Sequence, residues 1–180
     1  MTVVVRNTRE TQIRVEVVPG TGESEIDTTI SFLDHMLVTL ARYASLDLRL
    51  TARGDLRHHL IEDVAIALGT AVAALVPPRA ARYGDRFIPM DDALVHVALD
   101  VGGRPYYCGP LPSDLYDHWF RSFADHALAT VHVRVLRGRN RHHVVEAAFK
   151  ALGAALRQAL VADSTSGVLS TKGAIGLEIT

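Results

Sequence analysis

The sequence predicts an α+β fold in which one half-domain is repeated, and two duplicated segments are the main reason for this prediction. The segment HHLIE at 58–62 reappears as HHVVE at 142–146, an offset of 84 residues. Upstream, DHMLVTLA at 34–41 corresponds to DHWFRSFA at 117–124, an offset of 83 residues. Two independent matches at nearly the same offset favour a duplication over chance. We therefore expect one domain built from two pseudo-repeats.

The hydrophobic pattern gives each half the same order of elements. Apolar and polar residues alternate, as in half-buried strands, at 13–17, 46–50, 93–100 and 131–135. After each His-His pair, apolar residues recur at helical spacing, from Ile61 to Leu75 and from Val145 to Leu160. Each half therefore reads strand, strand, helix, strand, helix. We expect an α+β sandwich in which the helices of each half pack on one face of a sheet.

The boundaries of the two halves follow from these elements. We expect a single domain over residues 1–180, with pseudo-repeats at about 1–80 and 87–180. Residues 79–86 should link the halves, and the stretch 83–92, which contains glycine and proline, should form a structured turn.

Composition excludes several classes of protein. The chain has 180 residues, 48% of them hydrophobic and 22% charged, with a formal net charge of -1. This balance argues against a nucleic-acid binder. The longest apolar run, 71–76, is far shorter than the roughly 20 residues of a membrane span. Cys108 is the only cysteine, so no internal disulfide can form. We expect a cytoplasmic protein without nucleic-acid or membrane partners.

The repeated His-His-x-x-Glu segment has the geometry of a metal-binding helix. The first His and the Glu lie four residues apart, about 40° in projection, so both can reach one ion. The second His is rotated by about 100° from the first and points elsewhere. One such helix can therefore serve two metal ions.

The candidate ligands come from all four repeated segments. They are His35, His58, His59, Glu62, His118, His142, His143 and Glu146. Three imidazoles and one carboxylate per ion suit Mn, Fe or Zn, and the lack of a nearby thiolate disfavours a structural zinc site. A single His-His pair is usually a surface accident, and a single Asp-His is usually a helix cap. Their joint repetition favours metal binding. Asp63, which follows Glu62, could orient a metal-binding side chain without itself binding the metal.

Other polar segments could bind an anion. The turn at 102–105 ends in Arg104, a side chain suited to phosphate or carboxylate. Ser170, Thr171 and Lys172 could cradle an anion near the C-terminus. Taken alone, these segments read equally well as a hairpin turn and a polar loop, and Glu10 reads as a surface carboxylate.

Taken together and in order, the motifs resemble the imidazoleglycerol-phosphate dehydratase family over essentially the whole chain. The matching segments are FLDHML at 32–37, HHxxED at 58–63, PMDDAL at 89–94, GRP at 103–105, HHxxExxFK at 142–150 and STKG at 170–173. No single piece is specific, but the combination is.

The resemblance implies both a fold and a reaction. The half-domain would be similar to the second domain of ribosomal protein S5. Subunits would form a homo-oligomer, a hollow 24-mer, with two divalent ions, Mn²⁺ by preference, at subunit contacts. The reaction would be the metal-dependent dehydration of imidazole glycerol phosphate to imidazole acetol phosphate in histidine biosynthesis. In this family the two metals hold the substrate imidazole as imidazolate.

The resemblance also implies roles for individual residues. Glu10 would shuttle protons, and Glu62 and Glu146 would belong to the catalytic centre. The substrate-binding set would be Glu10, Arg82, Arg104, Lys150, Ser170, Thr171 and Lys172.

The ligands would divide between the two metals according to the pairing of the repeats. One metal would take His58, Glu62, His118 and His143. The other would take His35, His59, His142 and Glu146.

The chain departs from the family pattern in two places. The segment Gly54-Asp55-Leu56 runs almost directly into His58, where the family has a longer acidic stretch. Thr39 and Tyr43 occupy positions where the family usually has Gln and His. Two alternatives follow from the same ligands: a metal-dependent hydrolase of a small phosphorylated substrate, and a metal-assembled shell that has lost catalysis.

Overall fold

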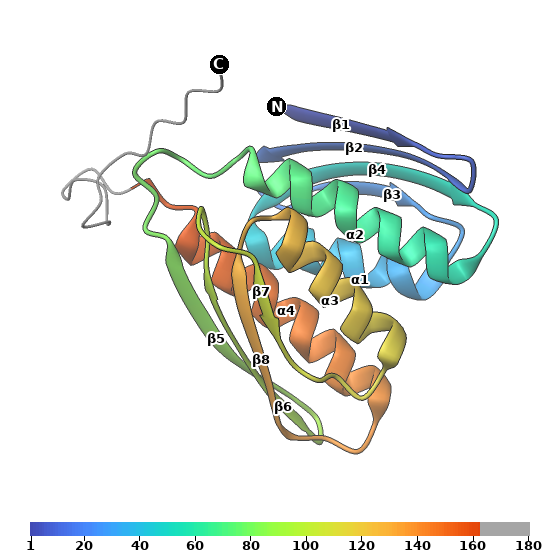
Figure 1. The fold of residues 1–180 in the computed structure, drawn as a ribbon. Helices are drawn as coiled ribbons and strands as arrows, with labels where there is room; N and C mark the ends of the chain where they lie inside the picture. The colour runs from blue at the N-terminus through green and yellow to red at the C-terminus, as the bar shows by residue number, and fades with distance from the viewer. Residues whose placement is uncertain (163–180) are drawn as a thin grey trace.

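Two four-stranded sheets enclose two layers of helices in the computed structural model, which describes residues 1–162 (Figure 1). The first half consists of β1 (Thr2–Asn7), β2 (Thr11–Pro19), β3 (Ser24–Asp27), α1 (Ser31–Ala44), β4 (Leu46–Gly54) and α2 (Arg57–Ala73). The second half consists of β5 (Tyr83–Met90), β6 (Ala93–Asp100), β7 (Tyr106–Cys108), α3 (Asp114–His126), β8 (Thr130–Arg137) and α4 (Arg141–Ala159). The α+β class and the duplication are thus confirmed. Ser170, Thr171 and Lys172 lie outside the described residues.

The two sheets have the same topology. Their strand orders are β1-β2-β4-β3 and β5-β6-β8-β7, so each strand of the first half has a counterpart in the second. All neighbours are antiparallel except β3 with β4 and β7 with β8. Parallel neighbours need a crossover, and α1 and α3 supply it. This crossover sets both Asp-His helices on the inner face of their sheets.

The structure adds one strand per half to the predicted order. β3 and β7 span only 4 and 3 residues, too few for an alternating pattern to be recognised. Each half is therefore strand, strand, strand, helix, strand, helix.

The predicted link at 79–86 and turn at 83–92 are wrong in extent. Residues 83–90 form β5, so the second repeat begins before residue 87, and only Asp91 and Asp92 turn the chain into β6. Gly84 and Pro89 suggested a turn for reasons that the structure explains. A Cβ at Gly84 would lie 2.0 Å from the Ala155 carbonyl oxygen, so the glycine lets α4 approach the sheet. Pro89 lies on an edge strand, where a missing N–H is tolerated.

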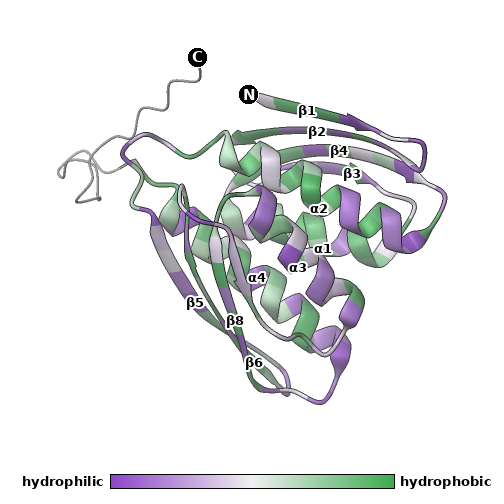
Figure 2. Ribbon diagram, in the orientation of Figure 1, coloured by the Kyte–Doolittle hydropathy of each residue, from purple (hydrophilic) through white to green (hydrophobic). Residues whose placement is uncertain are grey.

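The core lies where the helices of one half meet those of the other. α1 packs on α4, and α2 packs on α3. Large side chains fill the space between them, and Trp119, Phe120, Phe123 and Phe149 are fully buried. Figure 2 shows hydrophobic and hydrophilic residues interspersed along the strands, and hydrophilic colouring at the amino-terminal ends of α2 and α4. None of the helices in residues 1–162 is long and apolar enough to cross a membrane.

Equivalent glycines permit the close helix contacts. A Cβ at Gly153 in α4 would lie 2.7 Å from the Leu40 carbonyl oxygen in α1. A Cβ at Gly69 in α2 would lie 2.7 Å from the Phe123 carbonyl oxygen in α3. Because real Cβ atoms do not approach carbonyl oxygens this closely, any larger residue would push the helices apart.

We predict that Gly153→Ala destabilises the protein by about 2 kcal/mol, since the added methyl group forces α1 away from α4. Denaturant unfolding measures the change. Gly69→Ala should have a similar effect at the α2–α3 contact. Arg157→Ala, on the exposed side of α4, is the control and should change stability little. Equal stability of Gly153→Ala and the control would contradict this account of the helix contact.

Candidate metal centre

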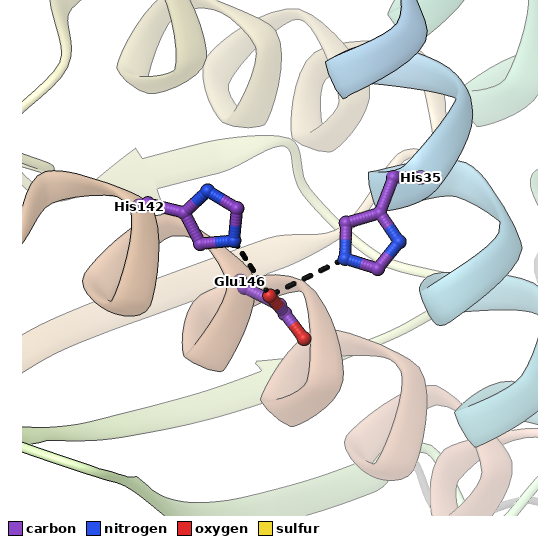
Figure 3. A group of neighbouring side chains, drawn as sticks. All are labelled: His35, His142 and Glu146. Atoms are coloured by element: carbon purple, nitrogen blue, oxygen red, sulfur yellow. Dashed lines mark hydrogen bonds and ion pairs between the residues drawn. The ribbon is translucent and has the colours of Figure 1, made fainter.

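The first cluster of ligand-type side chains joins α1 to α4. His35 comes from α1, and His142 and Glu146 come from one side of the first turns of α4 (Figure 3). The Glu146 Oε2 atom lies 3.1 Å from His142 Nε2 and 3.3 Å from His35 Nε2. One donor atom from each of the three residues lies within 4.8 Å of the other two, which is close enough for all three to bind one ion.

The second cluster repeats this arrangement between α3 and α2. Glu62 Oε1 lies 3.2 Å from His118 Nε2, and Glu62 Oε2 lies 3.7 Å from His58 Nε2. His118 Nε2 is buried and makes no hydrogen bond with a described residue, although its partner oxygen is near. A buried polar atom normally has a partner. A nitrogen and a carboxylate oxygen that are this close but not hydrogen-bonded could both bind one ion.

Helix geometry separates the two histidines of each pair as expected. The second histidines, His59 and His143, do not join the clusters of their own chain. His59 Nδ1 lies 3.0 Å from Asp55 Oδ1 and 3.6 Å from Glu10 Oε2. His143 Nδ1 lies 2.7 Å from Asp92 Oδ1. Both rings are thus anchored through Nδ1, the arrangement that usually orients a metal-binding imidazole.

The two anchoring carboxylates were missed from the sequence. Asp92 was seen only as part of a motif, and Asp55 only as part of a shortened loop. Asp92 accepts the backbone N–H of Arg139 at 2.6 Å and of Asn140 at 3.1 Å. The Arg139 N–H and the His143 ring hold the Asp92 pKa well below its usual range. The hydrogen bond that the Asp55 carboxylate accepts from the His59 ring in turn raises the pKa of His59.

Asp63 does not have the predicted role of orienting a ligand. Its carboxylate is buried and binds Thr11 Oγ1 at 2.5 Å and Arg6 Nη2 at 2.9 Å. It therefore ties α2 to β1 and the start of β2. The sequence placed it beside Glu62, but one step along a helix turns a side chain by about 100°.

A second pair of aspartates fixes the helices that carry His35 and His118. Asp34 Oδ1 accepts the Thr28 N–H at 2.8 Å and the Thr28 hydroxyl at 2.5 Å. Asp117 Oδ1 accepts the Leu111 N–H at 2.8 Å and the Tyr107 hydroxyl at 2.6 Å. Each carboxylate thereby holds the preceding loop against its helix, one residue before the histidine.

Glu146 is the more buried of the two cluster carboxylates. Its side chain is 9% exposed, against 35% for Glu62. Lys150 Nζ lies 2.9 Å from Glu146 Oε1. Burial alone raises the Glu146 pKa, but Lys150 and His35 more than offset it, so the net pKa is lowered. The structure therefore places Lys150, predicted to bind substrate, beside a candidate metal ligand.

The two arginines predicted to bind phosphate lie far from these clusters in the same chain. Arg82 lies beside the carboxyl-terminal end of α4, where its backbone N–H donates to the Ala159 carbonyl at 3.1 Å, and its guanidinium pairs with Asp100 at 2.9 Å. A Cβ at Gly103 would lie 3.7 Å from Arg82 Nη2, so the turn that bears the exposed Arg104 is adjacent. The structure thus groups both arginines at the opposite end of α4 from Glu146.

Fold and site together define an internally duplicated α+β protein with two matching His–Glu clusters. The family model of imidazoleglycerol-phosphate dehydratase matches residues 28–156. The enzyme of that name from Methanoculleus marisnigri is 47% identical, over 96% of this chain and 97% of its own. The corresponding enzyme from Clostridium botulinum is 44% identical, over 94% of this chain and 95% of its own.

Solved structures of this enzyme are also similar. The Pyrococcus furiosus enzyme superposes with a TM-score of 0.85 at 42% identity, covering 95% of this chain and 99% of its own. The Staphylococcus aureus enzyme has a TM-score of 0.79 at 32% identity, covering 91% of this chain and 100% of its own. The chain therefore belongs to the imidazoleglycerol-phosphate dehydratase family, the hydro-lyases of histidine biosynthesis that act on a phosphorylated imidazole.

We predict that Tyr107 makes stability fall at alkaline pH. Burial and the Asp117 carboxylate raise the pKa of Tyr107, so the unfolded phenol, with its ordinary pKa of about 10, ionises first. The contribution is complete below pH 10 and is lost as pH rises above it. Tyr107→Phe should lower stability at neutral pH by about 1–2 kcal/mol and flatten the loss above about pH 10. Denaturant unfolding at each pH is the measurement. Parallel curves for both proteins would contradict the assignment.

Proposed function

We propose that the protein uses two divalent metal ions to dehydrate imidazole glycerol phosphate to imidazole acetol phosphate. The main observation is the pair of equivalent His–His–Glu clusters. In one of them the buried His118 Nε2 lies 3.2 Å from Glu62 Oε1 but makes no hydrogen bond with a described residue. Two imidazole nitrogens and a carboxylate oxygen form a donor set that suits Mn²⁺ and leaves positions for further ligands. Bound ions would act as Lewis acids and would fix the substrate imidazole.

A complete site needs more than one copy of the chain. His59 and His143 have Nδ1 anchored on carboxylates, and each lies outside the cluster on its own helix. We therefore assign His143 to the Glu62 cluster and His59 to the Glu146 cluster of neighbouring copies. Arg82 is about 25 Å from His142, since 17 residues of helix separate its partner Ala159 from that histidine. A substrate of ordinary size cannot span this distance, so phosphate and metal ligands would come from different copies.

These arguments support a homo-oligomer with sites at subunit contacts, and the 24-subunit assembly is proposed on the family resemblance. In the assembled site, Arg82 and Arg104 would bind the substrate phosphate. Arg82 is held in place by Asp100, which pre-orients its guanidinium. Ser170, Thr171 and Lys172 are proposed to complete this end of the site.

Glu10 is the proposed proton shuttle. Its carboxylate is exposed, on the turn between β1 and β2, and lies 3.6 Å from His59 Nδ1. A carboxylate beside a metal-binding histidine of one copy would face the substrate held by another. Its carboxylate would take the proton from one hydroxyl-bearing carbon while the hydroxyl on the neighbouring carbon leaves, which gives an enol. As the enol becomes the ketone, Glu10 would return its proton to carbon, and the enol O–H proton would join the departed hydroxide to form water.

We predict that the purified protein loaded with Mn²⁺ converts imidazole glycerol phosphate into the keto phosphate, and that chelation abolishes turnover. Glu10→Gln should keep the metal and lose at least about 100-fold in turnover, because general acid–base catalysis contributes on this scale. Release of inorganic phosphate would instead show a hydrolase. Metal-dependent assembly with no product would show a shell without catalysis. Full activity of Glu10→Gln would reject Glu10 as the shuttle.

We also predict that two inactive variants restore activity when they share an assembly. Arg104→Ala lacks a phosphate ligand, and Glu146→Gln lacks a metal ligand. If these residues meet only across copies, randomly mixed assemblies from co-expression regain about a quarter of the wild-type sites. Separately assembled variants mixed after purification are the control. Absence of restored activity in the co-expressed sample would argue for a site within one chain.

A further inference from the structure

The duplication gives the two metal clusters the same types of ligand from equivalent positions. The histidines His35 and His142 of one correspond to His118 and His58 of the other, and Glu146 corresponds to Glu62. The two halves differ at the position four residues after each glutamate, which lies on the same face of the helix. Lys150 follows Glu146, whereas Ile66 follows Glu62. Comparison of the Glu146 cluster with the Glu62 cluster therefore isolates the effect of the Lys150 ammonium group.

Lys150 changes what Glu146 can offer to an ion. Its Nζ lies 2.9 Å from Oε1, and the pair is largely buried, with exposures of 20% and 9%. Glu146 directs only Oε2 at its histidines, as Figure 3 shows. Glu62 directs Oε2 at His58 and Oε1 at His118, and the described residues place no cation beside it. Glu146 is thus limited to one oxygen, while both oxygens of Glu62 are free to bind.

The positive charge of Lys150 also weakens metal binding at the Glu146 cluster. A buried ammonium that contacts the liganding carboxylate sits within a few ångströms of any dication bound there, and the repulsion is strong where water is excluded. Among residues 1–162, no Lys or Arg pairs with the Glu62 carboxylate. On the basis of the proposed metal-dependent function, we propose that Lys150 makes the two metal sites unequal: the Glu62 site fills first and tightly, and the Glu146 site fills second and weakly.

The expected asymmetry is about tenfold or more in dissociation constant, as a unit charge near a partly buried dication implies. Titration of the metal-free protein with Mn²⁺ at pH 8, followed by the EPR signal of free Mn²⁺, should show two classes of site. Glu62→Gln should remove the tight class, and Glu146→Gln the weak one.

Exchange of the two differing residues tests the role of Lys150. Lys150→Met should tighten the weak class about tenfold and leave the tight class unchanged. Lys150→Arg should behave as wild type, because it keeps the charge. Ile66→Lys, the mirror variant, should weaken the tight class. This variant tests the inference even if Lys150→Met folds poorly, and thermal unfolding of each variant detects that case.

The outcomes separate the inference from the function on which it rests. Two equal Mn²⁺ sites in the wild type, or no response of the weak class to Lys150→Met in a folded protein, would overturn the inference while leaving the metal-dependent function intact. Failure of the wild type to bind Mn²⁺ would overturn the proposed function itself.

Discussion

The contact between helices of opposite halves is the constraint on which the rest of this structure depends. Each candidate cluster takes one histidine from a crossover helix and a His–Glu pair from the last helix of the other half. Glycines at the crossings bring the backbones within reach, with the Cβ position of Gly153 only 2.7 Å from a carbonyl oxygen. Donor atoms can lie within 4.8 Å of one another only because the helices that carry them are this close.

Carboxylates then fix what the helices bring together. Asp34 and Asp117 tie each crossover helix to the loop before it, one residue ahead of the cluster histidine. Asp55 and Asp92 anchor the remaining histidines, which face away from their own clusters. Rings that are held before any ligand arrives lose little conformational freedom on binding. The Asp34 and Asp117 contacts repeat in both halves. The other two anchors come from different places, because Asp55 lies four residues from His59 and Asp92 lies 51 residues from His143.

The sequence was most informative where a pattern repeats. The His-His-x-x-Glu helices, the separation of their histidines and the duplicated α+β order followed from spacing alone, and the structure bears them out. Short strands such as β7 left no readable pattern. Gly84 and Pro89 suggested a turn, but the requirement for close approach to α4 placed them in a strand. Asp63 and Asp92 could not be assigned, because their partners lie 52 and 51 residues away along the chain.

The interlocking of the halves also constrains how such a chain could have arisen. Because α1 packs on α4 and α2 on α3, neither half contains a complete hydrophobic interior. A free half-chain would expose the inner faces of both its helices to water. A second half-chain could cover these faces. Two separate half-chains would therefore have to pair in order to fold, and their folding would depend on concentration. A covalent link between the halves removes this dependence and allows the two equivalent sites to differ in sequence.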